Sequence, residues 1–265
     1  MSPTLLSPAT SFAASTVVRE TRFATSLARD ATGETVRHVQ EWLTFHGLGL
    51  KIDGEFGAAT ETAVLAFQKR SSLPVTGRVD ETTFDTMLAP LSAALRPING
   101  SGVLSQDAPR YAEQHLAQRP REIGDENCGP WVRLYMNGAE GVDFPWCAGF
   151  ACFVLNQASA GRPLPFVPSV SCDEIGIHAK DRGLFREGGP GFDTSRLKTG
   201  SLFLVRRPQG GWHHTGIVVG ISNGAITTIE GNTNDSGSRE GFEVCKRVRA
   251  TTILDFVALE NRSQF

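Results

Sequence analysis

Residues 213–232 read HHTGIVVGISNGAITTIEGN, and this stretch decides the fold of the larger part of the chain. Two runs rich in β-branched residues are separated by Ser222-Asn223-Gly224, a sequence typical of a tight hairpin turn. Further strand-like runs occupy 200–207, 242–249 and 253–259. Helices are predicted before them, from Pro109 onward and at 129–136 and 146–157. Helices followed by a meander of strands favour an α+β domain with an antiparallel sheet.

Upstream of this domain, the sequence predicts a small unit of three helices. Apolar residues recur at helical spacing in three segments, 34–47, 60–67 and 81–88. A shift of 23 residues places Gly54 over Gly77 and Thr60 over Thr83, so a loop–helix unit is repeated. We expect Thr60 to cap the second helix, because threonine at a helix start accepts hydrogen bonds from the backbone.

Length and composition divide the chain into two domains, since 265 residues exceed the size of a usual single domain. We predict a flexible leader, a helical domain, a linker rich in Pro, Gly and Ser, and an α+β domain, at residues 1–32, 33–89, 90–107 and 108–265.

The charge balance gives no sign of a nucleic-acid or membrane partner. The net charge is -2, with 26 basic against 28 acidic residues, so no overall cationic field attracts anionic polymers. No run reaches the ~18 apolar residues of a membrane helix. The first residues lack a basic segment before their apolar run, so we expect no signal peptide. We expect a monomer that binds no nucleic acid and inserts into no membrane.

Five cysteines, at positions 128, 147, 152, 172 and 245, leave at least one thiol unpaired within the chain. The chain has no C-x-x-C pair and no H-E-x-x-H, which argues against zinc. Near Cys147 the only carboxylates are Glu140 and Asp143, too few for the oxygen shell of calcium. We therefore predict no metal site and no cofactor.

Cys147 is the first candidate for chemistry. It lies in PWCAGFACFVLNQ (145–157), where Pro145 suits a helix start and the following apolar residues have helical spacing. A thiol in the first turn of a helix is favoured as the thiolate by the exposed backbone N–H groups. The alternative is an inert buried thiol, which is how we interpret Cys152.

A base and an orienting acceptor are predicted from the hairpin. His214 opens an apolar strand beside Gly216, and Glu230 and Asn232 project from one face of the next strand. Counting outward from the turn places both almost opposite His214. A thiol, a base and an orienting acceptor form a complete nucleophilic set. Ordinary turn chemistry is the alternative for Glu230 and Asn232, and a satisfied surface or core role is the alternative for His214.

Two family resemblances bear on these predictions. Residues 39–88, with the DG.FG..T..AV..FQ core, resemble the peptidoglycan-binding domain 1 module, a three-helix wall-targeting unit. Its Asp53–Gly57 loop, with Phe56, either contacts the wall or only shapes its own turn. Residues 108–260 resemble the CHAP domain, a papain-like cysteine- and histidine-dependent amidohydrolase/peptidase. The motifs are N.GPWV..Y (127–135), PWCAGF (145–150), LKTGSLFLV (197–205), HHTGIVVGI (213–221) and TIEGNTNDSGSREG (228–241).

The CHAP resemblance implies Cys147 as nucleophile, His214 as base, and Glu230 and Asn232 as the polar residues that complete the site. Asn127 either lines the substrate cleft or caps the helix at 129–136. Together the two resemblances imply a peptidoglycan hydrolase that cleaves an amide of the stem peptide or its junction with the glycan. The alternative is an inactive wall-binding or scaffolding protein. Without a signal peptide, delivery to the wall is expected by phage lysis or a secretion system.

Overall fold

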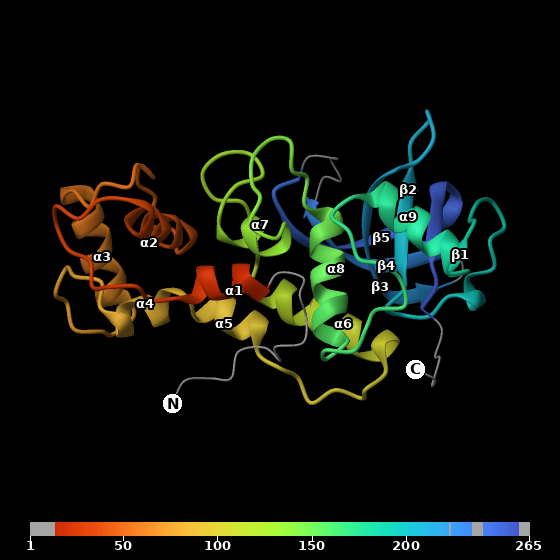
Figure 1. Ribbon diagram of the computed structural model, residues 1–265, viewed down its shortest axis with the longest axis horizontal. Helices are drawn as coiled ribbons and strands as arrows, with labels where there is room; N and C mark the ends of the chain where they lie inside the picture. Colours follow the sequence, from red (N-terminus) through yellow and green to blue (C-terminus); the bar gives the residue numbers. More distant parts are fainter. Residues whose placement is uncertain (1–13, 223, 235–240, 260–265) are drawn as a thin grey trace.

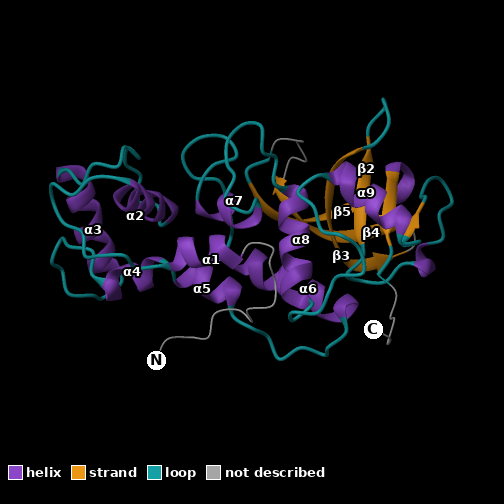
Figure 2. Ribbon diagram, viewed as in Figure 1, coloured by secondary structure: helices purple, strands orange, loops and turns teal. Residues whose placement is uncertain are grey.

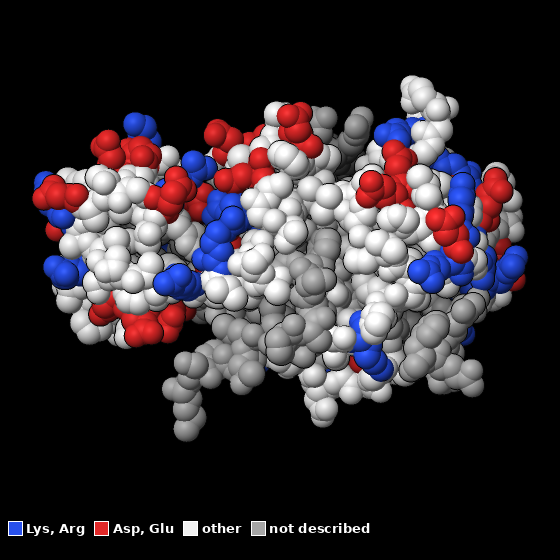
Figure 3. Space-filling view, in the orientation of Figure 1, with Lys and Arg blue, Asp and Glu red and all other residues white. Residues whose placement is uncertain are grey.

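The computed structural model describes residues 14–222, 224–234 and 241–259. These residues form an N-terminal helical part and a C-terminal part in which helices pack on a sheet (Figure 1). The α+β class predicted from the sequence is confirmed, and helix and strand segregate along the chain (Figure 2). Acidic and basic side chains are interspersed on the helical part (Figure 3), as the small net charge indicates.

The helices are α1 (Ala14–Thr21), α2 (Glu34–Phe45), α3 (Ala58–Arg70), α4 (Glu81–Met87), α5 (Ala89–Leu95), α6 (Leu104–Ala117), α7 (Pro130–Tyr135), α8 (Cys147–Ala158) and α9 (Cys172–Asp181). Short 3-10 turns lie at Thr194–Arg196 and Thr251–Ile253. Within the described residues, no helix has the length and apolar character needed to cross a membrane.

The strands are β1 (Phe185–Arg186), β2 (Leu202–Arg206), β3 (Trp212–Ser222), β4 (Ala225–Thr233), β5 (Glu243–Ala250) and β6 (Leu254–Val257). They form one sheet in the order β1-β6-β2-β3-β4-β5, and every neighbouring pair is antiparallel. β3 and β4 pair up to Ser222 and Ala225, as the predicted hairpin requires. Asn223 of the turn lies outside the described residues, as do 235–240 of the last CHAP motif.

Two buried glutamines explain the internal repeat of the helical module. Gln40 accepts from the backbone N–H of Gly54 at 2.8 Å and donates to Thr60 Oγ1 at 3.1 Å. Gln68 accepts from Gly77 N–H at 3.0 Å and donates to the Thr83 hydroxyl at 3.1 Å. Each glutamine side chain therefore binds both a loop and the helix that follows that loop. It can do so because a glutamine amide offers a donor and an acceptor together.

One expectation for this module is corrected, and one of two open alternatives is excluded. Thr60 does not cap α3, whose N-cap is Gly57; its hydroxyl instead serves Gln40 and donates to the Glu55 carbonyl. Phe56 is only 1% exposed and belongs to the core, so its ring is not available to the wall. Burial of such an aromatic ring stabilises the module through the apolar area removed from water.

The leader and the linker are more ordered than their composition predicts. Residues 14–21 form α1, which packs on α7 with Val17 and Glu20 buried, while residues 1–13 lie outside the described part. In the expected linker, α5 ends at Leu95 and α6 begins at Leu104, which leaves only 96–103 as a loop. The reason is packing: Leu91, Ala94 and Leu95 are fully buried, so apolar contacts override the loop-like composition.

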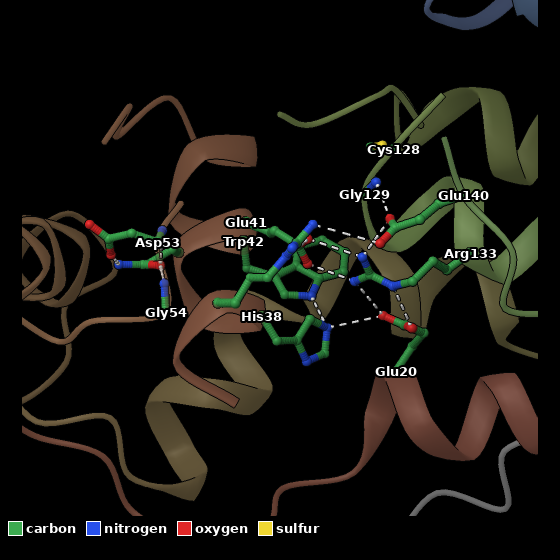
Figure 4. A network of polar contacts seen from close by, with 12 residues as sticks. Glu20, His38, Glu41, Trp42, Asp53, Gly54, Cys128, Gly129, Arg133 and Glu140 are labelled. Atoms are coloured by element: carbon green, nitrogen blue, oxygen red, sulfur yellow. Dashed lines mark hydrogen bonds and ion pairs between the residues drawn. The ribbon is translucent and has the colours of Figure 1, made fainter. Parts of the chain in front are cut away.

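The helical module is docked on the α+β domain through both aromatic and charged contacts. Trp42 of α2 packs edge-on against Trp131 of α7, with ring centroids 6.1 Å apart. Beside them, Arg133 of α7 donates to Glu20 of α1 at 2.9 Å and to Glu41 of α2 at 2.6 Å (Figure 4). These contacts join the leader, the module and the α+β domain at one point, which we call the domain junction.

The sheet carries side chains on both faces. In β2, Leu202 and Leu204 join the main core, whereas Phe203 and Val205 join a second apolar cluster, as strand alternation requires. Helix α8 packs on β3 and β4. At Gly231 of β4 a Cβ would lie 2.7 Å from the Phe150 and Trp146 side chains of the α8 segment. Glycine there lets the strand approach the helix start closely.

Candidate active site

Cys147 is the first residue of α8, as the sequence predicts. Pro145 and Trp146 precede it, and Trp146 is the N-cap. The Cys147 side chain is almost fully buried at 3% exposed, yet it lines a cavity of about 120 Å³. The first N–H groups of a helix have no partner within the helix, so this position favours negative charge on sulfur.

His214 of β3 lies beside the thiol. Its Nε2 is 2.8 Å from Glu230 Oε2, and the imidazole and the Cys147 thiol line the same cavity, where each shifts the pKa of the other. Because Nε2 is engaged by the carboxylate, Nδ1 is the nitrogen left for the sulfur. Gly216 makes this possible, since a Cβ there would lie 2.8 Å from Glu230 Cγ. The structure thus brings together Cys147, His214 and Glu230.

Glu230 is fully buried and is held by two further side chains. Arg249 of β5 donates from Nε and Nη2 to the two carboxylate oxygens, each at 2.5 Å. The Thr228 hydroxyl donates to Oε1 at 2.5 Å. Arg249 in turn lies over the Phe203 ring, 5.1 Å from its centroid. A two-point arginine contact fixes the carboxylate plane, and so fixes where the imidazole can bind.

Arg249 is a residue that sequence reasoning missed. In the run RVRA of β5 (247–250) the basic residues alternate with apolar ones, which is also the pattern of any strand with one polar face. Nothing in that pattern distinguishes Arg249, which binds a buried carboxylate, from its neighbour Arg247.

The electrostatics favour a charged pair of sulfur and imidazole. The pKa of Cys147 is lowered well below its usual value, first by a hydrogen bond from Cys172 and then by His214, against the opposing effect of burial. Burial alone would lower the pKa of His214, but the Cys147 thiolate and Glu230 outweigh it and raise it to about 9. Glu230 stays ionised because Arg249 and His214 lower its pKa to about 2 despite burial.

Asn232 does not contact His214, although the strand count places it opposite. Its Oδ1 accepts from the Trp146 backbone N–H at 3.2 Å, and its Nδ2 donates to the Gly241 carbonyl at 2.8 Å. Asn232 therefore supports the residue before Cys147, while Glu230 holds His214. Asn232 lies at the end of β4 with a φ of 54°, in the left-handed region. Its side chain therefore does not follow the alternation of side chains between the two faces of a regular strand.

Asn127 lies on the wall of the cavity and does not cap α7, whose N-cap is Gly129. Its Oδ1 accepts from Asn232 Nδ2 at 3.1 Å. Glu122 completes this group, since its carboxylate accepts from Trp146 Nε1 at 2.9 Å and from the Asn127 backbone N–H at 2.9 Å. The sequence does not single out Glu122, because other acidic residues lie close to it in the same loop.

Cys172 is a further residue to which the sequence assigned no role. It is the first residue of α9, and its Sγ lies 3.7 Å from Cys147 Sγ. Its own pKa is raised well above the usual value, chiefly by the hydrogen bond to Cys147, so it is the thiol that keeps its proton. No spacing rule connects residues 147 and 172 in sequence.

Glu140, one of the two carboxylates near Cys147 in the sequence, has protein partners. Glu140 accepts from the Gly129 N–H and from Arg133 Nη1, both at 2.9 Å. In the part of the chain that the structure describes, no three His, Cys, Asp or Glu side chains are grouped so as to hold a metal ion.

Comparison with known families agrees with this organisation. Residues 32–87 match the peptidoglycan binding domain model, and residues 139–232 match the CHAP domain model. The chain is a peptidoglycan-binding module joined to a CHAP domain. The CHAP match contains Cys147, His214, Glu230 and Asn232. The two domains together indicate a peptidoglycan hydrolase that acts at the cell wall.

Among solved structures, the crystal structure of the SleB N-terminal domain is similar to part of the chain. It is 33% identical, covers 26% of this chain and 96% of that chain, and gives a TM-score of 0.25. The search of curated proteins finds no match.

Proposed function

We propose that the CHAP domain is a cysteine-dependent hydrolase that cleaves an amide bond in the peptidoglycan stem peptide or at its junction with the glycan. The observation that carries this proposal is the series Cys147, His214, Glu230 and Arg249, which begins at a cavity at the start of α8. A thiol, an imidazole and a buried carboxylate in this order are suited to acyl transfer.

The proposed reaction begins with the ion pair. The Cys147 thiolate attacks the amide carbonyl, and backbone N–H groups at the start of α8 stabilise the oxyanion. The His214 imidazolium then gives its proton to the leaving amine, and water releases the acyl-enzyme. Glu230 keeps the imidazole in place and favours its charged form, since it accepts from Nε2.

Asn232 and Asn127 have supporting roles in this proposal. Asn232 would hold the Trp146 backbone and so the position of the thiol, while Asn127 would form the cavity wall that substrate meets. The module at 32–87 would raise the local concentration of the catalytic domain at the wall.

Digestion of purified peptidoglycan tests the mechanism and identifies the bond. Wild-type protein and Cys147→Ala are incubated with peptidoglycan, and released fragments are analysed by mass spectrometry. We expect new amino termini with wild type only, and their position states which amide is cut. Equal release by both proteins would rule out the thiol mechanism. No release by either, with wall binding retained, would favour a scaffolding protein.

A further inference from the structure

The site contains a second buried thiol that the proposed reaction does not use. Cys147 and Cys172 are the first residues of α8 and α9, and their sulfurs lie 3.7 Å apart. They are 3% and 8% exposed, so solvent reaches this pair only narrowly. A disulfide needs sulfurs about 2.05 Å apart, so rotation of one or both side chains must close the remaining gap.

The two thiols differ in reactivity, which sets an order of events. Cys147 is the thiolate of the pair, and thiolates rather than thiols react with peroxides. Cys147 also lines the cavity, through which a small oxidant reaches the sulfur. Cys172 retains its proton and donates it in a hydrogen bond to the Cys147 sulfur. The Cys172 sulfur therefore already lies beside the sulfur atom that would be oxidised.

We propose that Cys147 and Cys172 form a reversible disulfide when the protein meets a peroxide, which switches the hydrolase off; the loss of activity rests on the proposed role of Cys147. The thiolate attacks one peroxide oxygen, whose O–O bond breaks, giving a sulfenic acid and hydroxide from hydrogen peroxide. Cys172 then attacks the Cys147 sulfur, the S–O bond breaks, and water leaves with the Cys172 proton. In sum, one thiolate and one thiol are oxidised to one disulfide, and one hydrogen peroxide is reduced to one hydroxide and one water.

The remaining cysteines are worse placed to resolve the sulfenic acid. Burial raises the pKa of Cys152 to about 12, and Cys152 is fully buried in α8. Cys128 lies in the loop before α7, where its Sγ donates to the Glu126 carbonyl at 3.3 Å. Cys245 lies in β5, opposite Glu230 in the sheet register. Cys172 is therefore the partner that the geometry selects.

Peptide mapping tests the disulfide independently of hydrolysis. The reduced full-length protein is treated with hydrogen peroxide, alkylated, and digested without reductant for mass spectrometry. We expect a linked peptide pair containing Cys147 and Cys172. In parallel, peptidoglycan hydrolysis is measured before peroxide, after peroxide, and after dithiothreitol. Wild type is expected to lose activity and to regain it with dithiothreitol.

Cys172→Ser and Cys172→Ala remove the resolving thiol and change the outcome. Without it the Cys147 sulfenic acid goes on to the sulfinic acid, so activity lost to peroxide stays lost after dithiothreitol. Cys128→Ser is the matched control, since it removes a thiol outside the pair. It should keep both the linked peptide and the reversible loss relative to its own untreated activity.

The failures of the two proposals are distinguishable. A linked Cys147–Cys172 peptide in a protein that releases no peptidoglycan fragments would overturn the proposed function and leave the disulfide standing. Hydrolysis that is lost to peroxide with no linked peptide, and equally in wild type and Cys172→Ser, would overturn the disulfide. Circular dichroism of both serine variants verifies that they are folded.

Discussion

The domain junction and the active site are built from the same chemistry, an arginine that neutralises buried glutamate. At the junction Arg133 contacts three carboxylates, those of Glu20, Glu41 and Glu140. In the site Arg249 contacts the single carboxylate of Glu230. At the junction several cations hold carboxylates from different segments and so fix how they pack; besides Arg133, His38 lies 3.2 Å from Glu20 and Arg37 lies 3.5 Å from Glu41. In the site Arg249 and His214 share the one carboxylate of Glu230, and this histidine lies in a cavity with the Cys147 thiol.

The comparison teaches that ion pairing alone does not mark a catalytic site. Glu20 and Glu230 are both buried, and the pKa of each is lowered to about 2 by its partners against burial. Only Glu230 binds a side chain, His214, that lies beside the proposed nucleophile Cys147. Its partner His214 has a pKa raised to about 9, whereas Arg133 stays charged at every accessible pH.

Removing the charge of Glu230 should have the largest effect on activity. In Glu230→Gln the imidazolium loses its acceptor and its preferred orientation, so we expect kcat/KM to fall roughly 10³–10⁴-fold. The measurement is hydrolysis of purified peptidoglycan by variant and wild type, with folding verified by circular dichroism. Near-normal activity in a folded variant would mean that Glu230 is structural, like Glu20.

Removing the arginine of the junction should affect stability instead. Arg133→Met leaves the buried Glu20 and Glu41 without the arginine that they share, which we expect to lower the free energy of unfolding by about 3 kcal/mol or more. Urea unfolding measures this change. The folded fraction should still hydrolyse peptidoglycan, and a loss of activity without a loss of stability would contradict the distinction between the two networks.

The pH dependence should separate the networks at high pH. Since the pKa of His214 is raised from 6.5 to about 9, its stabilising charge is fully present below pH 6.5 and is lost as pH rises through 9. We expect activity to fall about tenfold per unit above that pH, because the leaving amine then lacks its proton donor. Arg133 keeps its charge there, so the junction should persist.

At low pH the two networks should weaken together. The pKa values of Glu20 and Glu230 are both lowered from 4.5 to about 2, so their contribution to stability is present above pH 4.5 and is lost as pH falls toward 2. Unfolding curves recorded at several pH values measure this loss of stability. An unfolding free energy that stays constant from pH 5 to about 2 would contradict the ion pairs as described.

A conservative change at Arg249 should cost less than the loss of Glu230. Arg249→Lys keeps the charge but cannot make the two-point contact, so we expect a loss of roughly tenfold in kcat/KM. The second measurement is the pH dependence of activity. The pH above which activity falls should be lower in the variant, because Glu230 is held less firmly beside His214. An unchanged pH dependence would limit Arg249 to packing over Phe203.

The smallest effect is expected at an exposed pair, which serves as the control for Arg133. Arg29 lies 3.1 Å from Glu61, and their side chains are 57% and 35% exposed. Arg29→Met should change the free energy of unfolding by less than about 1 kcal/mol, because solvent screens the pair. A loss as large as that of Arg133→Met would show that burial does not explain the difference.

Much of this organisation follows from the sequence alone. The hairpin turn and the strand runs place His214 near Glu230, the helix start is predicted at Cys147, and the CHAP resemblance implies that the two act together. The 23-residue repeat predicts paired loops in the module. These features depend on neighbours close in the chain. Local spacing fails where side chains from distant segments meet, as for α1 and α5, whose burial against other helices decides that they fold.

The choice between Glu230 and Asn232 needed the sheet itself. Counting residues from the turn places both near His214, but the backbone turns at Asn232 and sends its amide to Trp146. The roles of Arg249 and Cys172 could not be predicted from the sequence either, because their contacts depend on the packed structure. Each comes from a different element, and only the packed sheet and helices bring it to the site.

The sequence by itself determined the two domains, the secondary structure around the hairpin and α8, and the residue types able to do the chemistry. The tertiary structure decided which carboxylate contacts His214, which arginine holds it, and which second thiol lies beside Cys147. The physical reason is range: turn geometry and helix starts act over a few residues, whereas pKa values and side-chain contacts depend on groups brought together by folding.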